Sequence, residues 1–190
     1  SDSAGDAVQR CYGLPLAHKT LVARHGNYDG AYPLAAERVQ ELGRMHHLDE
    51  THTTILFFGS IRRYKGVDQL IDAFRHTTNP RLRLLVAGRP FMPEIEAKLR
   101  QLAAGDPRIV LEFGFIDQND VAAWFALADA VVVPFEQTLS SGSAVLAMTL
   151  GKALILPTHA SVLDLADEQG AIYFKSASEL TECLQALEKN

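Results

Sequence analysis

Short runs of hydrophobic residues alternate with helical hydrophobic spacings along most of the chain. The first clear pair is the apolar run at residues 55–58, followed by Val67, Leu70, Ile71 and Phe74. A short apolar run is typical of a strand buried on both faces, whereas the spacing i, i+3, i+4, i+7 places side chains on one face of a helix. These residues therefore predict a strand followed by an amphipathic helix.

The same alternation continues to the end of the chain. Further strands are predicted at residues 82–87, 109–113, 130–133, 153–156 and 171–174. Helices are predicted around residues 95–102, 121–125, 144–150 and 180–187. We expect Asn119 or Asp120 to cap the helix around residues 121–125. The helix at residues 144–150 is apolar nearly all round, so we expect it to be fully buried.

Strands that alternate with helices indicate a parallel sheet covered on both faces. We therefore predict the α/β class, with a doubly wound, Rossmann-like parallel sheet of about six strands and helices on both faces. This domain is expected to span residues 51–190. Residues 1–50 are expected to form a separate leading segment, with a strand near residues 20–23, a helix around residues 35–42 and a linker at residues 49–54.

Composition narrows the class of protein. The length of 190 residues favours a single domain. The net charge of −5 argues against a general nucleic-acid binder. We expect no transmembrane segment, because even the apolar run at residues 126–135 contains Asp129. We find no secretory signal, and the two cysteines, Cys11 and Cys183, lie at opposite ends. These features predict a cytoplasmic protein.

The loop predicted after the first strand is basic, although the chain is acidic. Residues 59–66 (GSIRRYKG) contain Arg62, Arg63 and Lys65 and no acid. In a doubly wound sheet, ligands bind outside the carboxyl ends of the strands, and the free N–H groups at a helix start favour an anion. We therefore predict a phosphate-binding loop; the alternative is a solvated loop with three surface cations. Arg89 follows the second predicted strand, so we expect it at the same edge.

Hydroxyl groups gather at the start of the predicted buried helix. Thr138, Ser140, Ser141 and Ser143 surround Gly142 there. Hydroxyls and free N–H groups at a fixed helix start suit phosphate oxygens. The alternative is simple capping of the helix by Ser140 or Ser141.

Several other kinds of site are not indicated. The motifs of P-loop nucleotide hydrolases, dinucleotide-dependent dehydrogenases and α/β-hydrolases do not occur in the sequence. His46, His47 and His52 are close in sequence, but no carboxylate or cysteine completes a metal site at the usual spacing. We therefore predict no metal site.

Six segments in order resemble the C-terminal, nucleotide-sugar-binding half of GT-B glycosyltransferases, and are most similar to glycosyltransferase family 4. They are HGN at residues 25–27, FGSIRRYKG at 58–66, LVAG at 85–88, FGFI at 113–116, ADAVVVP at 128–134 and AMTLGKA at 147–153. The resemblance implies that residues 1–50 lead in from a missing N-terminal domain. It also implies a nucleotide-diphosphate sugar as substrate and no required cofactor.

The resemblance also assigns roles to individual residues. The donor diphosphate would be bound by Gly59, Ser60, Arg62, Lys65, Ser140, Ser141, Gly142 and Ser143. Backbone at Phe115 and Ile116 would meet the base, and Arg89 and Thr138 would complete the donor site. Cationic side chains would neutralise the departing diphosphate, so no metal is implied.

The sequence departs from the family pattern at two places. Ser60 stands where the family usually has an arginine, so Arg62 or Arg63 would supply that charge. The family's paired glutamates would fall on Thr138 and Leu146, which leaves Glu136 as the candidate catalytic residue. The TLSSGS segment at residues 138–143 resembles a variant branch associated with bacterial exopolysaccharide or glycolipid synthesis, for which the stereochemistry stays open.

We therefore predict a glycosyltransferase donor domain that acts on a saccharide or glycolipid acceptor held by the missing domain, and that is inactive alone. The parent enzyme is expected to be cytoplasmic, at most peripheral at the inner face of the membrane. Two alternatives remain: an epimerase or phosphorylase with the same fold, and a non-catalytic flavodoxin-like binding module. The second fits less well, because Gly59 and Ser60 stand where receiver modules carry acids.

Overall fold

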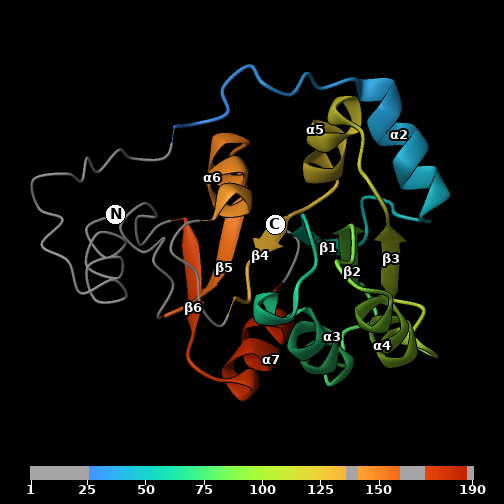
Figure 1. Cartoon of the computed structure of the whole chain (residues 1–190), viewed down its shortest axis with the longest axis vertical. Coiled ribbons are helices and arrows are strands. Elements are labelled where there is room, and N and C mark those ends of the chain that lie inside the picture. Colours follow the sequence, from blue (N-terminus) through green and yellow to red (C-terminus); the bar gives the residue numbers. More distant parts are fainter. Residues whose placement is uncertain (1–25, 136–140, 159–169, 188–190) are drawn as a thin grey trace, which may run out of the picture.

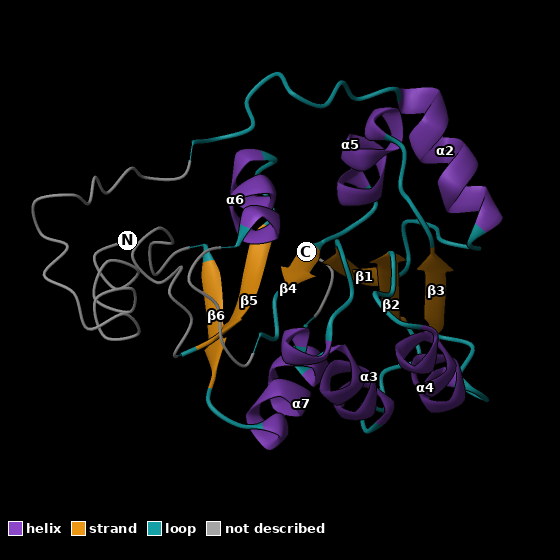
Figure 2. Cartoon of the chain, in the orientation of Figure 1, coloured by secondary structure: helices purple, strands orange, loops and turns teal. Residues whose placement is uncertain are grey.

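The computed structural model describes residues 26–135, 141–158 and 170–187. Its centre is a sheet of six strands, all paired in parallel, in the order β3-β2-β1-β4-β5-β6 (Figure 2). The strands are β1 Thr53–Phe58, β2 Leu82–Gly88, β3 Ile109–Phe113, β4 Ala130–Val132, β5 Ala153–Pro157 and β6 Ala171–Phe174. The predicted doubly wound fold is confirmed.

Helices cover both faces of the sheet (Figure 1). One face carries α3 Val67–Arg75, α4 Pro93–Ala103 and α7 Ala177–Gln185. The other carries α2 Ala36–Met45, α5 Gln118–Ala126 and α6 Gly142–Thr149. The predicted helical stripe on α3 is buried, since Leu70, Ile71 and Phe74 have no exposed surface. The side chains of α3 that face away from the sheet, among them Asp72, are exposed.

The core lies on both sides of the central strands. Leu56 of β1 is fully buried and stands in register between Leu85 of β2 and Val131 of β4. Its neighbours Ile55 and Phe57 both point to the face opposite that of Leu56, because side chains alternate along a strand, and they too are buried. Because both faces are covered, the strand reads as a continuous apolar run.

The strand order reverses between β1 and β4. From β1 the chain builds outward through β2 and β3, then returns to β4 on the other side of β1 and continues to β6. The loops that leave the carboxyl ends of β1 and β4 therefore lead to opposite faces of the sheet. A crevice between such loops is where open α/β sheets bind ligands.

One predicted cap is wrong. Asp117 caps α5, because its carboxylate accepts a hydrogen bond from the Asn119 N–H at 2.9 Å. Asp120 instead receives two hydrogen bonds from Arg38 of α2, at 2.6 and 2.7 Å. The predicted helix around residues 35–42 is therefore present and packs on α5, while β1 begins at Thr53, inside the expected linker. The strand expected near residues 20–23 lies outside the described residues.

Candidate functional site

Two glycines fix the loop that follows β1. Gly59 has φ 118° and donates its N–H to the carbonyl of Ala87 at 3.0 Å. After a short 3-10 turn, Arg63–Lys65, Gly66 has φ 63° and is the N-cap of α3. A Cβ atom at Gly66 would overlap the carbonyl oxygen of Pro134. The loop therefore packs directly against the chain that leaves β4.

The loops after β1 and β2 are joined in the same way. Gly88 has φ 146°, and a Cβ atom there would overlap the carbonyl oxygen of Gly59. Ile61 then donates its N–H to the Arg89 carbonyl at 2.8 Å, and Phe91 donates to the Ile61 carbonyl at 2.9 Å. These backbone contacts hold the basic loop rigidly at the carboxyl edge of the sheet.

Lys65 is the half-buried cation of this loop. Its ammonium lies 3.8 Å from the position that a Cβ atom would take on Gly59, and 4.9 Å from the ring centroid of Phe135. Burial and, to a lesser extent, the positive charge of Arg62 lower the pKa of Lys65. Within the described parts of the chain, no carboxylate pairs with this ammonium. The ammonium of Lys65 is therefore a partly desolvated positive charge with no negative partner among the described residues.

The two arginine candidates lie farther out. The Arg62 guanidinium rests over the ring of Phe91, 4.3 Å from its centroid, and both side chains are exposed. Arg89 is also exposed, and its backbone rather than its side chain joins the two loops. Both arginines lie at the carboxyl edge of the sheet, as predicted, and the charge of Arg62 is near enough to lower the pKa of Lys65.

The start of α6 faces the basic loop. The Ser143 hydroxyl donates to the Phe58 carbonyl at 2.9 Å and lies 3.1 Å from the Cβ position of Gly59. The N–H groups of Gly142 and Ser143 have no hydrogen-bond partner among the described residues. Ser141 differs: it is buried, and its hydroxyl accepts the Ala144 N–H at 3.2 Å. It caps the helix, as the alternative interpretation of this segment held.

The predicted base contacts lie two strands away from β1. Phe115 follows β3 and is 81% exposed, whereas Ile116 is half-buried and packs against the core. The Gly114 N–H donates to the Gly88 carbonyl at 3.2 Å, so the ends of β3 and β2 are also tied together. Glu136, Thr138 and Ser140 lie outside the described residues.

The structure thus brings together a subset of the predicted residues. Gly59, Lys65, Gly142 and Ser143 meet where the strand order reverses, with Ser60, Arg62 and Arg89 at the rim. A lysine and free helix N–H groups are donors that hold phosphate oxygens, and the Ser143 hydroxyl, which donates to the Phe58 carbonyl, fixes the start of α6 beside them. Phe135 was not among the predicted residues; its signal was an aromatic residue directly after Pro134, two residues beyond the end of β4.

A cavity of about 680 Å³ adjoins this cluster on its α3 and α4 side. Arg62, Arg63, Tyr64 and Glu94 are among its lining residues, but Lys65 and Ser143 are not. Hence the cavity lies beside the cluster of Lys65 and Ser143 and does not include it. In the residues that the structure describes, no group of three His, Cys, Asp or Glu side chains could hold a metal, and no helix could cross a membrane.

Comparison with known sequences identifies glycosyltransferases as the relatives of this chain. The family model described as "Glycosyl transferases group 1" matches residues 52–190. A GDP-mannose:glycolipid 4-beta-D-mannosyltransferase from Xanthomonas campestris pv. campestris is 30% identical over 146 residues. The match covers 77% of this chain but only 39% of that enzyme, so the chain spans well under half the length of this relative.

Solved structures share the fold. WaaG, a glycosyltransferase involved in lipopolysaccharide biosynthesis, superposes with a TM-score of 0.74 at 21% identity, over 93% of this chain and 49% of that one. HepE from Anabaena, in complex with UDP and glucose, superposes with a TM-score of 0.66 at 15% identity, over 87% of this chain and 46% of HepE. The C-terminal domain of LpcC from Francisella tularensis superposes with a TM-score of 0.62 at 24% identity, over 84% of this chain and 86% of that domain. The fold is that of one half of a GT-B glycosyltransferase.

Proposed function

This chain belongs to the group 1 glycosyltransferase family, and from that premise we propose that it is the donor-binding half of an enzyme that transfers a sugar from a nucleotide diphosphate. One observation carries the proposal. The Lys65 ammonium, which has no carboxylate partner among the described residues, converges with the Ser143 hydroxyl and the start of α6 where the strand order reverses. A diphosphate supplies the negative charge that this arrangement requires.

In the proposed reaction the bond between the anomeric carbon of the sugar and the diphosphate oxygen breaks. An acceptor hydroxyl forms the new bond to that carbon and gives its proton to a base, for which Glu136 is the candidate from sequence. Negative charge collects on the departing diphosphate. Lys65 and the N–H groups of Gly142 and Ser143 would stabilise this charge, and preorganised donors of this kind account for large rate effects in enzymes.

The donor we propose is a guanosine diphosphate sugar, with mannose as the first sugar to test. This choice follows the name of the Xanthomonas relative, which uses GDP-mannose and a glycolipid acceptor. We propose a glycolipid or saccharide acceptor as well, held by a further domain from which residues 1–50 lead in. The UDP bound to HepE belongs to a protein that resembles this chain in fold alone. Placement in family 4, a cytoplasmic location and independence from metals stay predictions.

Calorimetric titration of the chain with GDP, UDP and ADP tests the proposal. We expect GDP to bind more tightly than the other two, and Lys65→Ala to weaken binding by about tenfold or more, because charge-assisted phosphate contacts contribute roughly 1.5–3 kcal/mol. Arg62→Ala should weaken binding less, since this side chain is exposed. Arg81→Ala is the matched control: it removes an exposed positive charge at the opposite edge and should leave binding unchanged. Equal effects of all three variants would contradict a specific site.

A further inference from the structure

Two of the three cations predicted for the donor site, Arg62 and Lys65, lie over aromatic rings. Arg62 lies over Phe91, which follows β2, and Lys65 lies over Phe135, which follows β4. The two pairs differ in their access to water: Phe91 is 63% exposed, whereas Phe135 is 3% exposed. Attraction between a cation and an aromatic face is stronger when water is excluded, so the Lys65 pair is the one that matters more.

The Phe135 ring is itself firmly placed. It packs edge-on against Tyr64, with the ring centroids 6.4 Å apart. The preceding residue, Pro134, is in tight contact with Gly66, the residue after Lys65 in the chain. Lys65 and Phe135 are therefore held together from both sides, by the 3-10 turn and by the chain that leaves β4.

A lysine side chain without such a contact would extend into water. Its four carbons rotate freely, and fixing them in one conformation costs conformational entropy. In this structure the ammonium instead lies back over the loop, close to Gly59 and the Ser143 hydroxyl. Because no carboxylate of the described residues holds it there, the face of the Phe135 ring is the group that compensates the buried charge.

We propose that Phe135 is a positioning residue, which holds the Lys65 ammonium at the anion site before the donor arrives. The inference rests on the proposed function, because it assigns Lys65 the diphosphate. It adds a role that is electrostatic rather than merely steric. An aliphatic residue of similar size would fill the same space but would leave the ammonium free to leave the site.

Site-specific fluorination of Phe135 separates these two roles. Mono-, di- and trifluorophenylalanine keep the shape of the ring while weakening its negative face stepwise. We expect the dissociation constant for GDP to rise with each fluorine, by about fivefold to tenfold in total. In the Lys65→Met background the same series should have no effect, because the cation is absent. A flat series in the wild-type background would overturn the proposal.

Phe74 provides a matched control. Its ring also carries a cation at 4.9 Å, the guanidinium of Arg108, but at the opposite edge of the sheet. Fluorination of Phe74 should leave the affinity for GDP unchanged. A loss equal to that from Phe135 would mean a general loss of structure and would overturn the proposal.

A second measurement needs no nucleotide and therefore separates this inference from the proposed function. The Lys65 ammonium can be titrated by NMR of labelled lysine, with Lys65→Met to assign the signal. Trifluorophenylalanine at position 135 should lower the pKa of Lys65, because the charged form loses its stabilising partner. If GDP fails to bind but this shift occurs, the donor proposal fails and the pairing stands. An unchanged pKa would overturn the pairing itself.

Discussion

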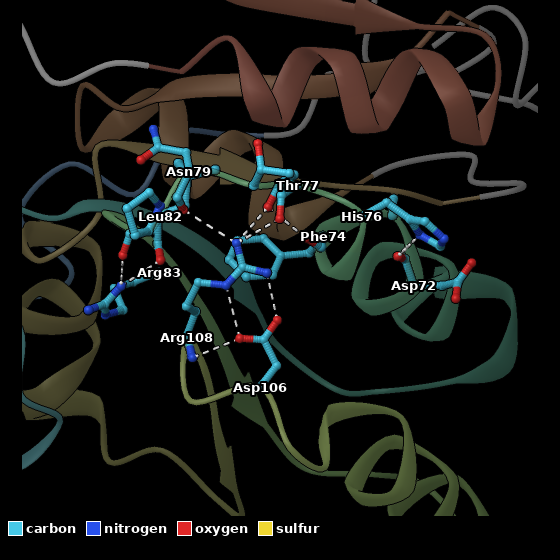
Figure 3. Close-up of polar contacts among 12 residues, drawn as sticks. Asp72, Phe74, His76, Thr77, Asn79, Leu82, Arg83, Asp106 and Arg108 are labelled. Atoms are coloured by element: carbon cyan, nitrogen blue, oxygen red, sulfur yellow. Dashed lines mark hydrogen bonds and ion pairs between the residues drawn. The ribbon is translucent and has the colours of Figure 1, made fainter.

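Positively charged side chains lie at both edges of the sheet, but their partners differ. At the amino edge, Arg108 donates to both carboxylate oxygens of Asp106, at 2.9 and 2.7 Å, and to the Thr77 carbonyl at 2.9 Å (Figure 3). At the carboxyl edge, Lys65 and Arg62 lie over aromatic rings and have no carboxylate partner among the described residues. The Arg108 network at the amino edge is electrostatically complete, whereas the two cations at the carboxyl edge are open to an anion.

If the proposed function holds, this difference separates charges that stabilise the fold from charges that bind the donor. Arg108 connects the end of α3 to the start of β3, and hydrogen bonding from it lowers the pKa of Asp106. All of these contacts exist without a ligand, so they stabilise the fold. The half-buried Lys65 does the opposite, because the ring of Phe135 compensates its desolvation only in part until a ligand binds.

The largest expected effect concerns the contacts between loops at the carboxyl edge. Gly88→Ala should lower the free energy of unfolding by about 3–4 kcal/mol, because strain at positive φ adds to overlap with the Gly59 carbonyl. Gly105→Ala, at the amino edge, should cost only about 1–2 kcal/mol. That glycine also has a positive φ, 83°, but nothing lies within 4 Å of its Cβ position. Urea unfolding of both variants measures the difference; equal losses would show that the loop contact is not tight.

The network at the amino edge comes next. Arg108→Ala should cost about 2–3 kcal/mol of stability, because it leaves the largely buried Asp106 carboxylate without its partner. The affinity for GDP should not change. Arg81→Ala, which removes an exposed charge nearby, should cost less than about 0.5 kcal/mol. A change in GDP affinity in the folded Arg108→Ala protein would contradict the separation of the two edges.

The same pair predicts a dependence on pH. Since the folded pKa of Asp106 lies below its ordinary value of 3.8, the unfolded chain binds the proton more readily. The stabilising contribution is therefore present above the ordinary value and is lost as the pH falls through the folded pKa. Acid titration of stability should show this loss in the wild-type chain and a smaller one in Asp106→Asn.

The cap of α6 should have a smaller effect. Ser141→Ala should lower stability by about 1 kcal/mol, because the Ala144 N–H loses its acceptor. Ser141 is buried and turned into the helix, so GDP affinity should be nearly unchanged. Ser143→Ala is the comparison, because its hydroxyl joins the start of α6 to the Phe58 carbonyl at the proposed site, and loss of this contact should weaken GDP binding. Equal loss of affinity in the two variants would restore Ser141 as a ligand residue.

Sequence periodicity predicted the strands and helices of the described residues because local burial determines it. The α5 cap was mispredicted for a reason that no local pattern contains. Asp117, Asn119 and Asp120 are all good caps, and the choice depends on Arg38, which is 82 positions from Asp120 and takes it as a partner. Charge alone likewise placed Lys65 and Arg62 at the site without separating the buried cation from the exposed one. That distinction comes from Phe135, which is distant in sequence and carries no charge.

The smallest expected effect has the opposite sign. Lys65→Met should raise the stability of the chain near neutral pH by up to about 1 kcal/mol, since it removes a poorly solvated charge and keeps a side chain of similar length. The same variant should lose most of its GDP affinity. Stability and binding would then change in opposite directions at the carboxyl edge, whereas Arg108→Ala changes stability alone.

The dependence of this gain on pH identifies its cause. The pKa of Lys65 in the folded chain lies below its ordinary value of 10.5, so between these two values the unfolded chain binds more protons. Wild-type stability relative to Lys65→Met should therefore rise with pH through that window, and the advantage of the variant should disappear above it. Denaturant unfolding of both proteins from neutral pH to about pH 11 measures this difference. An advantage that stays constant with pH would mean that methionine simply packs better, and that Lys65 carries no desolvation cost for a ligand to relieve.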